Sequence, residues 1–348
     1  MIGGLTKYLT LDGTDLSFVF SPGTTSTKSG YLLSDGRTDL SDIFATKGAN
    51  TANITGYKYI SAGIENDINN LYEKLELFSV SFNIPTDSQF TKQTTTDGLY
   101  DVYTIIGQSG TDGLSSGTWN NKTVVATFTA KTAKTIYYVC VGGGGYTFIA
   151  TTNTKGSCGG GGAGAFREGS LNINSNTSLT FTAGGSYKTS TITSTITSTI
   201  TSGYGGFASR QSTSQNGNNG SSGGGGSGSA STQDARGTGD PPGNDGGDAL
   251  IGTTNISGGG GGGAGGDGAN ASGGTGGAGG IGLVPSFYAI QEFYTSPLCV
   301  GGRGHGTTTG VGASSSTFGS GAGGGTGNAN TTYRYGRPGA IIIAVPKT

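Results

Sequence analysis

The fold expected for this chain depends on one stretch, SGGGGGGAGGDGANASGGTGGAGG, which runs from Ser257 to Gly280. Long glycine runs are usually flexible linkers, because glycine loses the most backbone entropy on ordering and brings no side chain to pack. In this run, however, other residues recur at every third position, with one slip: Ala264, Asp267 and Asn270, then Ser272, Thr275 and Ala278. That period is typical of an extended threefold helix of the polyproline type, in which glycine lets neighbouring backbones approach closely. We predict a run packed backbone against backbone; the alternative is a flexible low-complexity loop.

The composition indicates an ordered and nearly neutral protein. Gly 73 and Pro 8 make up 81 of the 348 residues, close to the proportion found in disordered chains. Charged residues, however, are only 11% and the formal net charge is -1, so the self-repulsion typical of disordered chains is missing. Near-zero charge gives no global basis for binding nucleic acid. No apolar stretch has the length of a signal peptide or a membrane span, and we expect neither.

Cysteine and histidine give little sign of catalysis. Cys140, Cys158 and Cys299 are odd in number and none lies in a CxxC pair, so we expect reduced thiols rather than disulfides or a zinc site. His305 is the only histidine. No base-orienting partner or nucleophile motif is readable around it, so we predict a solvated loop residue rather than part of a catalytic triad.

Acidic residues and glycine motifs do not define a ligand site either. Asp240, Asp245, Asp248 and Asp267 match neither the EF-hand loop nor the tandem repeat of calcium-binding β-helices. The phosphate-binding pattern GxxxxGK[ST] is missing, and matches to GxGxxG are inevitable in so much glycine. We therefore predict no catalytic, cofactor or metal site, and no enzyme activity.

A short repeat occurs near the N-terminus. Its copies are DGTDLSFVF from Asp12, DGRTDLSDIF from Asp35 and a weaker GIENDINNLY from Gly63. Apolar residues at i, i+3 and i+4 form one face of a helical turn, and a preceding Thr-Asp supplies cap and first-turn acid chemistry. We call these side chains the repeat face: Leu16, Val19, Phe20, Leu40, Ile43, Phe44, Ile68, Leu71 and Tyr72.

The repeat units are too small to bury this face alone, so they must pack against something else. Two hypotheses follow for the repeat face. It docks onto another protein, or its side chains pack only on one another.

Strand patterns dominate from Leu77 onward. LFSVSFNIP, LYDVYTIIG and TVVATFTA alternate apolar and polar residues between turn signals. Two near-continuous apolar runs, Ile136 to Val141 and Ala340 to Val345, predict buried strands that pair and close the glycine-rich region into one domain.

Four segments between those two runs have their own patterns. Ala165 to Gly185 is predicted to be two paired strands across a polar turn. TSTITSTITSTITS, with Ile192, Ile196 and Ile200, predicts an exposed strand or a hairpin arm. Gln211 to Gly247 is the best candidate for a surface loop. The aromatic segment from Leu283 to Val300 is either core or a contact patch.

The predicted fold class is therefore mainly β. It comprises an N-terminal short-helix repeat arm for docking (1–76), a β-strand region (77–134) and a glycine-rich β domain with extended polyglycine-type segments (135–348).

Two features resemble known families. VCVGGGG at Val139, GGGGAGAFREGSLNI at Gly159, the long glycine run and the terminal GRPGAIIIAVP occur in this order. The series resembles the glycine-rich domain of virus and phage structural proteins, over roughly Val125 to Lys347. Phe166 stands where that family usually has Tyr, and AVP replaces its basic-aromatic end. Independently, the G-x-DL-x-x-[IV]-F repeat resembles an N-terminal repeat in virion proteins of large DNA viruses that infect algae and protists.

These resemblances imply a virion protein made in the host cytoplasm, a minor capsid component. Its expected partners are other capsid proteins, chiefly the major capsid protein, and further copies of itself. The alternative is a receptor- or glycan-binding adhesin or fibre protein that displays loops on the particle surface. A glycan hydrolase ranks third, because it needs two carboxylates at a set separation and the sequence places no such pair.

Overall fold

The computed structural model describes most of the chain after residue 88 and one short hairpin before it. The described residues are 58–61, 64–67, 89–108, 122–130, 133–149, 156–175, 177–194, 198–208, 216–229, 235–241, 243–251, 256–306, 316–325 and 332–347. The chain divides into two compact units, Met1–Ser79 and Val80–Thr348.

The described part of the first unit is an antiparallel hairpin of β1 (Lys58–Ser61) and β2 (Ile64–Asp67). Strand β2 occupies the first half of the third repeat copy, where the sequence predicted a short helix. Tyr and Ile favour strands, and pairing with β1 satisfies the backbone polar groups of both segments. The helical repeat arm is therefore not supported here. The nine residues that make up the repeat face all lie outside the described residues.

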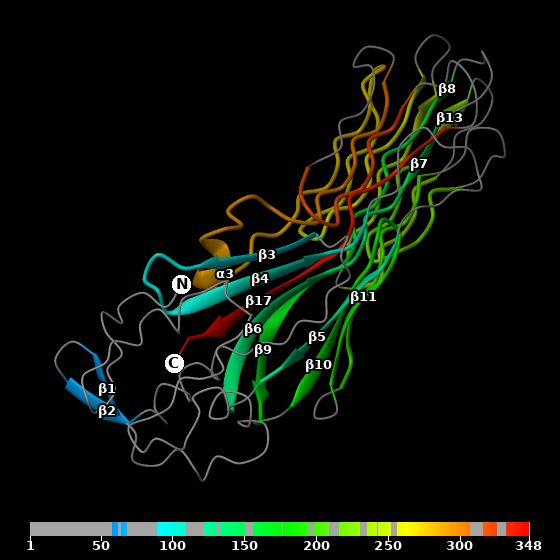
Figure 1. The fold of residues 1–348 in the computed structure, drawn as a ribbon. Coiled ribbons are helices and arrows are strands. Elements are labelled where there is room, and N and C mark those ends of the chain that lie inside the picture. Colours follow the sequence, from blue (N-terminus) through cyan, green and yellow to red (C-terminus); the bar gives the residue numbers. More distant parts are fainter. Residues whose placement is uncertain are drawn as a thin grey trace. The chain divides into compact units, whose positions relative to one another are not determined.

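Two antiparallel sheets form one part of the second unit (Figure 1). The five-stranded sheet has the order β3 (Gln89–Thr94), β4 (Tyr100–Ile106), β17 (Ala340–Pro346), β6 (Lys134–Val141) and β9 (Phe166–Ile173). The four-stranded sheet has the order β12 (Ile200–Ser202), β11 (Ser190–Ser194), β10 (Ser178–Ala183) and β5 (Val124–Thr129). The chain is thus mainly β, as its alternating sequence patterns predict.

Strand β17 is the centre of the five-stranded sheet and is buried on both faces. Ile341 and Ile343 join the core between the two sheets, where the Phe128 and Phe181 ring centroids lie 6.2 Å apart. Ile342 belongs to a second core on the opposite face. Burial on both faces explains the unbroken apolar run. Its predicted pairing with β6 is confirmed, with Ala340 opposite Val141 in register.

The aromatic segment near residue 290 covers that second core. It contains the single turn α3 (Tyr288–Gln291), whose Ala289 and Ile290 are buried. Phe287 stacks on Tyr137 of β6, with ring centroids 3.6 Å apart. Of the two sequence interpretations of this segment, core packing is therefore confirmed.

Two predicted details of strand pairing need correction. Strands β9 and β10 form as expected but do not pair, because β9 lies beside β6 and β10 lies between β5 and β11. The turn between them crosses from one sheet to the other. The Thr-Ile tract forms the hairpin β11–β12, but Ile192 faces the core and is only 1% exposed.

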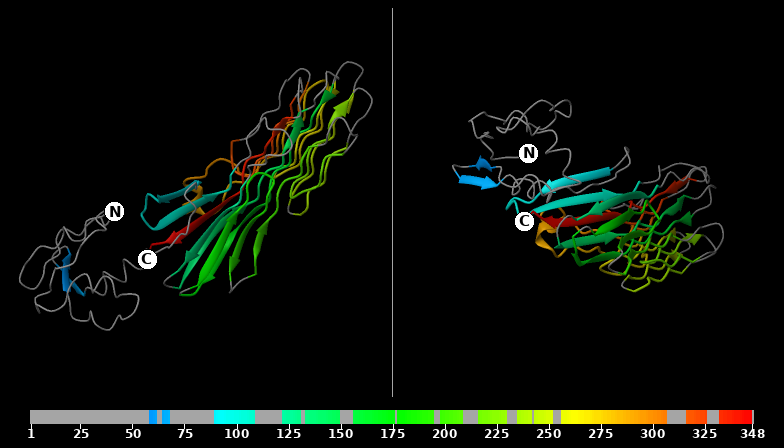
Figure 2. Two further views of the ribbon diagram at one scale, coloured as in Figure 1. Left: turned by 45° about the vertical axis from the view of Figure 1, so that its right-hand side comes forward. Right: turned by 60° about the horizontal axis from the view of Figure 1, so that its bottom comes forward.

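Three two-stranded ribbons complete the described strands. They are β7 (Thr147–Ile149) with β16 (Thr332–Arg334), β8 (Gly156–Ser157) with β13 (Gly228–Ser229), and β14 (Leu250–Ile251) with β15 (Ile256–Ser257). β7, β8 and β13 lie at the end of the glycine-rich region far from the large sheets (Figure 1). Between the ribbons and the sheets, extended segments run alongside one another (Figure 2).

Replacing Ile342 by Ala should lower the free energy of unfolding by about 2–5 kcal/mol, because the side chain is fully buried in the central strand. Val125, 45% exposed on β5, is the control, and Val125→Ala should cost less than about 1 kcal/mol. Chemical denaturation followed by circular dichroism measures both. Equal losses would show that β17 is not a core strand.

Candidate binding surfaces of the glycine lattice

The glycine-rich segments form one hydrogen-bonded array, which we call the glycine lattice: residues 142–145, 158–165, 203–208, 216–229, 235–241, 243–249, 256–283, 298–306, 316–325 and 335–339. Its geometry is clearest in residues 160–165, whose six backbone N–H groups donate at 2.7–2.9 Å to neighbours that change with a period of three. The acceptors are, in order, the carbonyls of Gly259, Ala322, Gly206, Gly262, Gly319 and Gly203. Each neighbouring segment is therefore met at every third residue.

The carbonyl groups of the same segment follow the same rule in other directions. They accept from three further segments, through the N–H groups of Gly225 and Ser222, of Gly302, and of Gly145 and Gly142. Three segments that accept and three that donate surround residues 160–165. This is the arrangement expected of parallel and antiparallel threefold helices, in which every peptide group points to a neighbouring chain.

The run that suggested this packing is itself part of the lattice. The N–H groups of residues 258–263 donate with the same period of three to His305, Gly226, Ala269, Gly302, Gly223 and Gly266. The run then folds back on itself at bridges Gly263–Gly266 and Ser272–Thr275. The one-residue slip in the sequence period falls beside the second turn, where Gly273 has a φ of +51°. The predicted three-residue packing is confirmed, and the linker alternative is wrong.

Close approach of the backbones is what requires glycine inside the lattice. A Cβ atom added at Gly261 would lie 2.0 Å from the carbonyl oxygen of Gly161, and one at Gly302 would lie 2.0 Å from that of Ala322. Real Cβ atoms do not approach backbone oxygens so closely, and hydrogen-bonded backbones have no free direction in which to move. The lattice interior is filled by main-chain atoms.

Asp and Asn side chains complete the hydrogen bonds at one border of the lattice. Asp267 and Asn270 accept from the backbone N–H groups of Asp245 and Asp248, at 2.9 and 2.7 Å. The carboxylates of Asp245 and Asp248 accept in turn from the N–H groups of Gly239 and Arg236. Within each segment the bonded residues are three apart, namely 236 and 239, 245 and 248, and 267 and 270, so these side chains continue the three-residue period of the lattice at its border. Among the described residues, no cluster of three or more His, Cys, Asp or Glu side chains could hold a metal ion.

The predicted surface loop from Gln211 to Gly247 is largely wrong. Its described residues belong to the lattice, and residues 222–228 are buried. Gly223 and Gly226 donate to the carbonyls of Asn244 and Gly247. The composition is the same for a loop and for this lattice, because both need Gly, Asn and Ser; only the neighbouring segments distinguish them.

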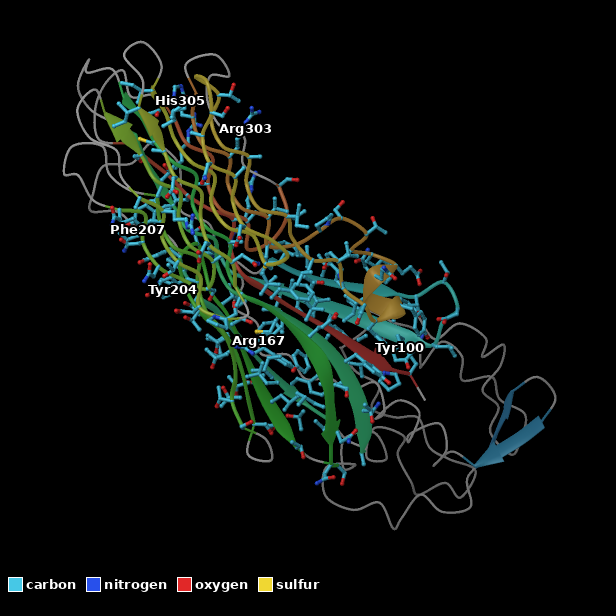
Figure 3. All side chains as sticks on the ribbon, turned by 180° about the vertical axis from the view of Figure 1, so that it is seen from behind. Tyr100, Arg167, Tyr204, Phe207, Arg303 and His305 are labelled. Carbon is cyan, nitrogen blue, oxygen red and sulfur yellow. The ribbon has the colours of Figure 1, made fainter. Side chains whose placement is uncertain are left out.

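An aromatic group lies beside the lattice and was missed by the sequence analysis. We call it the aromatic flank: Tyr146, Tyr187, Tyr204 and Phe207. Tyr146 stacks on Phe207 with centroids 5.0 Å apart, and the Tyr187 and Tyr204 rings are 4.3 Å apart. Tyr204 is 39% exposed, and Figure 3 shows it next to Phe207 on one side of the lattice. The sequence signal that could have indicated the aromatic flank is an aromatic residue that directly follows or interrupts glycines, as in GGGGY and SGYGGF.

Tyr187 is held in a backbone conformation that is rare for a residue with a side chain. Its φ is +56°, in the left-handed region that favours glycine. Burial, together with the neighbouring Tyr204, raises the pKa of Tyr187 to about 12, so its hydroxyl stays protonated at neutral pH. The surrounding contacts therefore maintain a strained residue in the aromatic flank, a feature often found at functional surfaces.

The thiols and the imidazole are buried. None of the three cysteines is in a disulfide, and burial raises the pKa of Cys140 to about 12 and that of Cys299 well above its usual range. Such thiols are poor nucleophiles at neutral pH. His305 is only 3% exposed, so the prediction of a solvated loop histidine is wrong. Its segment lies in the lattice, its Nδ1 has no hydrogen-bond partner, and burial and the nearby Arg334 lower its pKa.

Comparison with known proteins adds one finding. A family model described as a glycine-rich domain matches residues 107–345, which cover the two sheets from β5 onward and the whole lattice. No curated protein and no solved structure matches the chain. In the part of the chain that the structure describes, no helix is long and apolar enough to cross a membrane.

Substituting one interior glycine should test the lattice. Gly261→Ala should reduce the free energy of unfolding by about 3 kcal/mol or more, because its Cβ meets a fixed carbonyl oxygen. Gly266→Ala is the matched control in the same run, since its Cβ would meet only Ile281, a side chain that is 68% exposed and free to turn. That control should change stability by less than about 1 kcal/mol. Thermal and chemical unfolding compare the two, and equal effects would refute backbone-to-backbone packing.

Acidification should destabilise the lattice through His305. Because its pKa is lower in the folded chain than the ordinary ~6.5, the unfolded chain binds more protons as the pH falls through that value, and stability declines. His305→Gln removes this titration. The melting temperature of the unsubstituted chain should therefore fall more between pH 7.5 and 5.5 than that of the variant. Identical pH dependence would show that the imidazole is not buried in its neutral form.

Proposed function

The chain belongs to the glycine-rich domain family, and from this premise we propose that it is a non-catalytic structural component of a virus particle, a minor capsid protein. The observation that carries the proposal is the lattice itself. A segment bonded to six neighbours through its backbone bends only if many hydrogen bonds break together, each worth about 1 kcal/mol. Such an array suits a stiff part of an assembly better than a site that must close around a substrate.

The proposed attachment to the particle is the N-terminal unit. We propose that its repeat face docks onto a neighbour rather than packing only on itself, because units of this size bury little apolar surface alone. In this proposal the neighbour is the major capsid protein or another capsid protein, with self-association as a second contact. The resemblance of these repeats to virion proteins of large DNA viruses supports this assignment. The second unit, from Val80, has its own cores and contains the lattice.

Purified particles of the encoding virus should contain this chain in fixed proportion to the capsid protein, as measured by quantitative mass spectrometry. A double variant, Phe20→Ser and Phe44→Ser, should abolish its incorporation while leaving the melting temperature of the second unit unchanged. Tyr204→Ser in the aromatic flank is the control and should be incorporated normally. Normal incorporation of the double variant would contradict docking through the repeat face.

A second candidate is an adhesin on the particle surface. The observation that favours it is the aromatic flank, because exposed, rigidly held Tyr side chains are typical of recognition surfaces. The position of the chain on the particle distinguishes the two functions. Density for the chain outside the capsid shell supports an adhesin, whereas density beneath the shell excludes it.

A further inference from the structure

A groove opens where the two large sheets separate. Strands β9 and β12 are edge strands of their sheets, so no further strand covers the space between them. The groove has a volume of about 570 Å³, within the ~300–1,000 Å³ typical of small-molecule sites, and is open to solvent. It is lined by Tyr138, Phe166, Arg167, Glu168, Thr199, Ile200 and Thr201.

A glycine keeps an aromatic ring uncovered in this groove. Tyr138 of β6 lies opposite Gly169 of β9 in register, and the latter has no side chain to cover the ring. A Cβ atom at Gly169 would lie 2.9 Å from the Tyr138 hydroxyl oxygen. The pair therefore places an apolar ring with a polar tip at the bottom of an accessible groove.

A guanidinium group is available in the same groove. Arg167 lies two residues before Gly169, so both point to the same face of the sheet. No ion pair joins Arg167 to any other residue that the structure describes. The neighbouring Glu168 points to the opposite face of β9, where its carboxylate accepts the backbone N–H of Ser286 at 2.8 Å. Figure 3 shows Arg167 near the boundary of the lattice and the sheets.

The chemistry of the groove favours a small ligand over an added peptide strand. An exposed edge such as β9 pairs readily with another strand, but charged residues in the edge discourage that pairing, and β9 carries Arg167 and Glu168 at consecutive positions. A planar guanidinium recognises a carboxylate through two parallel hydrogen bonds. The Tyr138 hydroxyl and the unpaired main-chain groups of the edge strands β9 and β12 add hydrogen-bond donors and acceptors.

We propose that this groove binds a sugar that carries a carboxylate. Arg167 pairs with the carboxylate, the Tyr138 ring packs on the C–H face of the sugar ring, and the Tyr138 hydroxyl and the unpaired main-chain groups of the β9 and β12 edges bond the sugar hydroxyl groups. The site gives the adhesin function a class of ligand. The proposal depends on the adhesin function only for the biological role of the binding. Sugar binding is measured on the isolated chain and the position of the chain is measured on the particle, so either result can fail without the other.

The test is calorimetric and NMR titration of the full chain with glucuronic acid and N-acetylneuraminic acid, against glucose and acetate. At least one acidic sugar should bind. The affinities of glucose and acetate should each be at least about tenfold lower, which is the change in affinity expected from losing one hydrogen bond to a charged group. If acetate bound with the same affinity as the acidic sugars, the assignment of a sugar ligand would be overturned. Failure of both acidic sugars to bind would overturn the site.

Variants locate the binding. Arg167→Gln should weaken the acidic sugar by about tenfold and leave the melting temperature unchanged, because the side chain is exposed. Gly169→Val should abolish binding by covering Tyr138. Lys122→Gln is the matched control, since this exposed cation precedes β5 at the opposite edge of the four-stranded sheet. The affinity of this variant for the acidic sugar should be unchanged. Unchanged affinity in Arg167→Gln would show that the sugar binds elsewhere.

Discussion

The second unit depends on hydrogen bonds between backbones that no side chains separate. In most proteins side chains fill the interior, and backbone hydrogen bonds form mainly within helices and sheets. Here a central segment such as residues 160–165 is hydrogen-bonded through its backbone to six neighbouring segments. Glycine is the residue that permits this spacing, because a Cβ at interior positions such as Gly160, Gly261 or Gly302 would meet a neighbouring carbonyl. The lattice therefore gains stability from many peptide hydrogen bonds, each small, rather than from apolar burial.

The sheets hold the lattice in register. Strands β6 and β12 lead directly into lattice segments, and lattice segments lead directly into β9 and β17, so the strand pairing fixes where each glycine segment starts or ends. Two buried hydroxyls lie at this junction. Ser190 and Ser202, paired across β11 and β12, donate to the carbonyls of Val141 and Cys140, the last residues of β6. One face of the Thr-Ile tract thus supplies Ile192 and Ile200 to the core and Ser190 and Ser202 to the start of the lattice.

The sequence predicts the local periods well and the neighbours poorly. The three-residue period of the long run and the paired apolar strands β6 and β17 follow from patterns within single segments. The mistaken loop at Gln211 to Gly247, the buried His305 and the missing β9–β10 pairing all depend on which distant segments lie alongside. The groove at Arg167 is equally invisible, since it forms between strands of different sheets. The repeat face, the interaction site predicted from sequence, lies outside the described residues and stays a prediction.

Amide hydrogen exchange of residues 258–263 tests the central claim most directly. The N–H groups of residues 258–262 donate to carbonyls of neighbouring segments, and that of Gly263 donates to Gly266 across a tight turn, so exchange requires these contacts to open. The account predicts that all six exchange orders of magnitude more slowly than amides of an unstructured glycine peptide, and as slowly as the amides of β17. Exchange at the rate of the free peptide would contradict the lattice and leave the run a flexible chain.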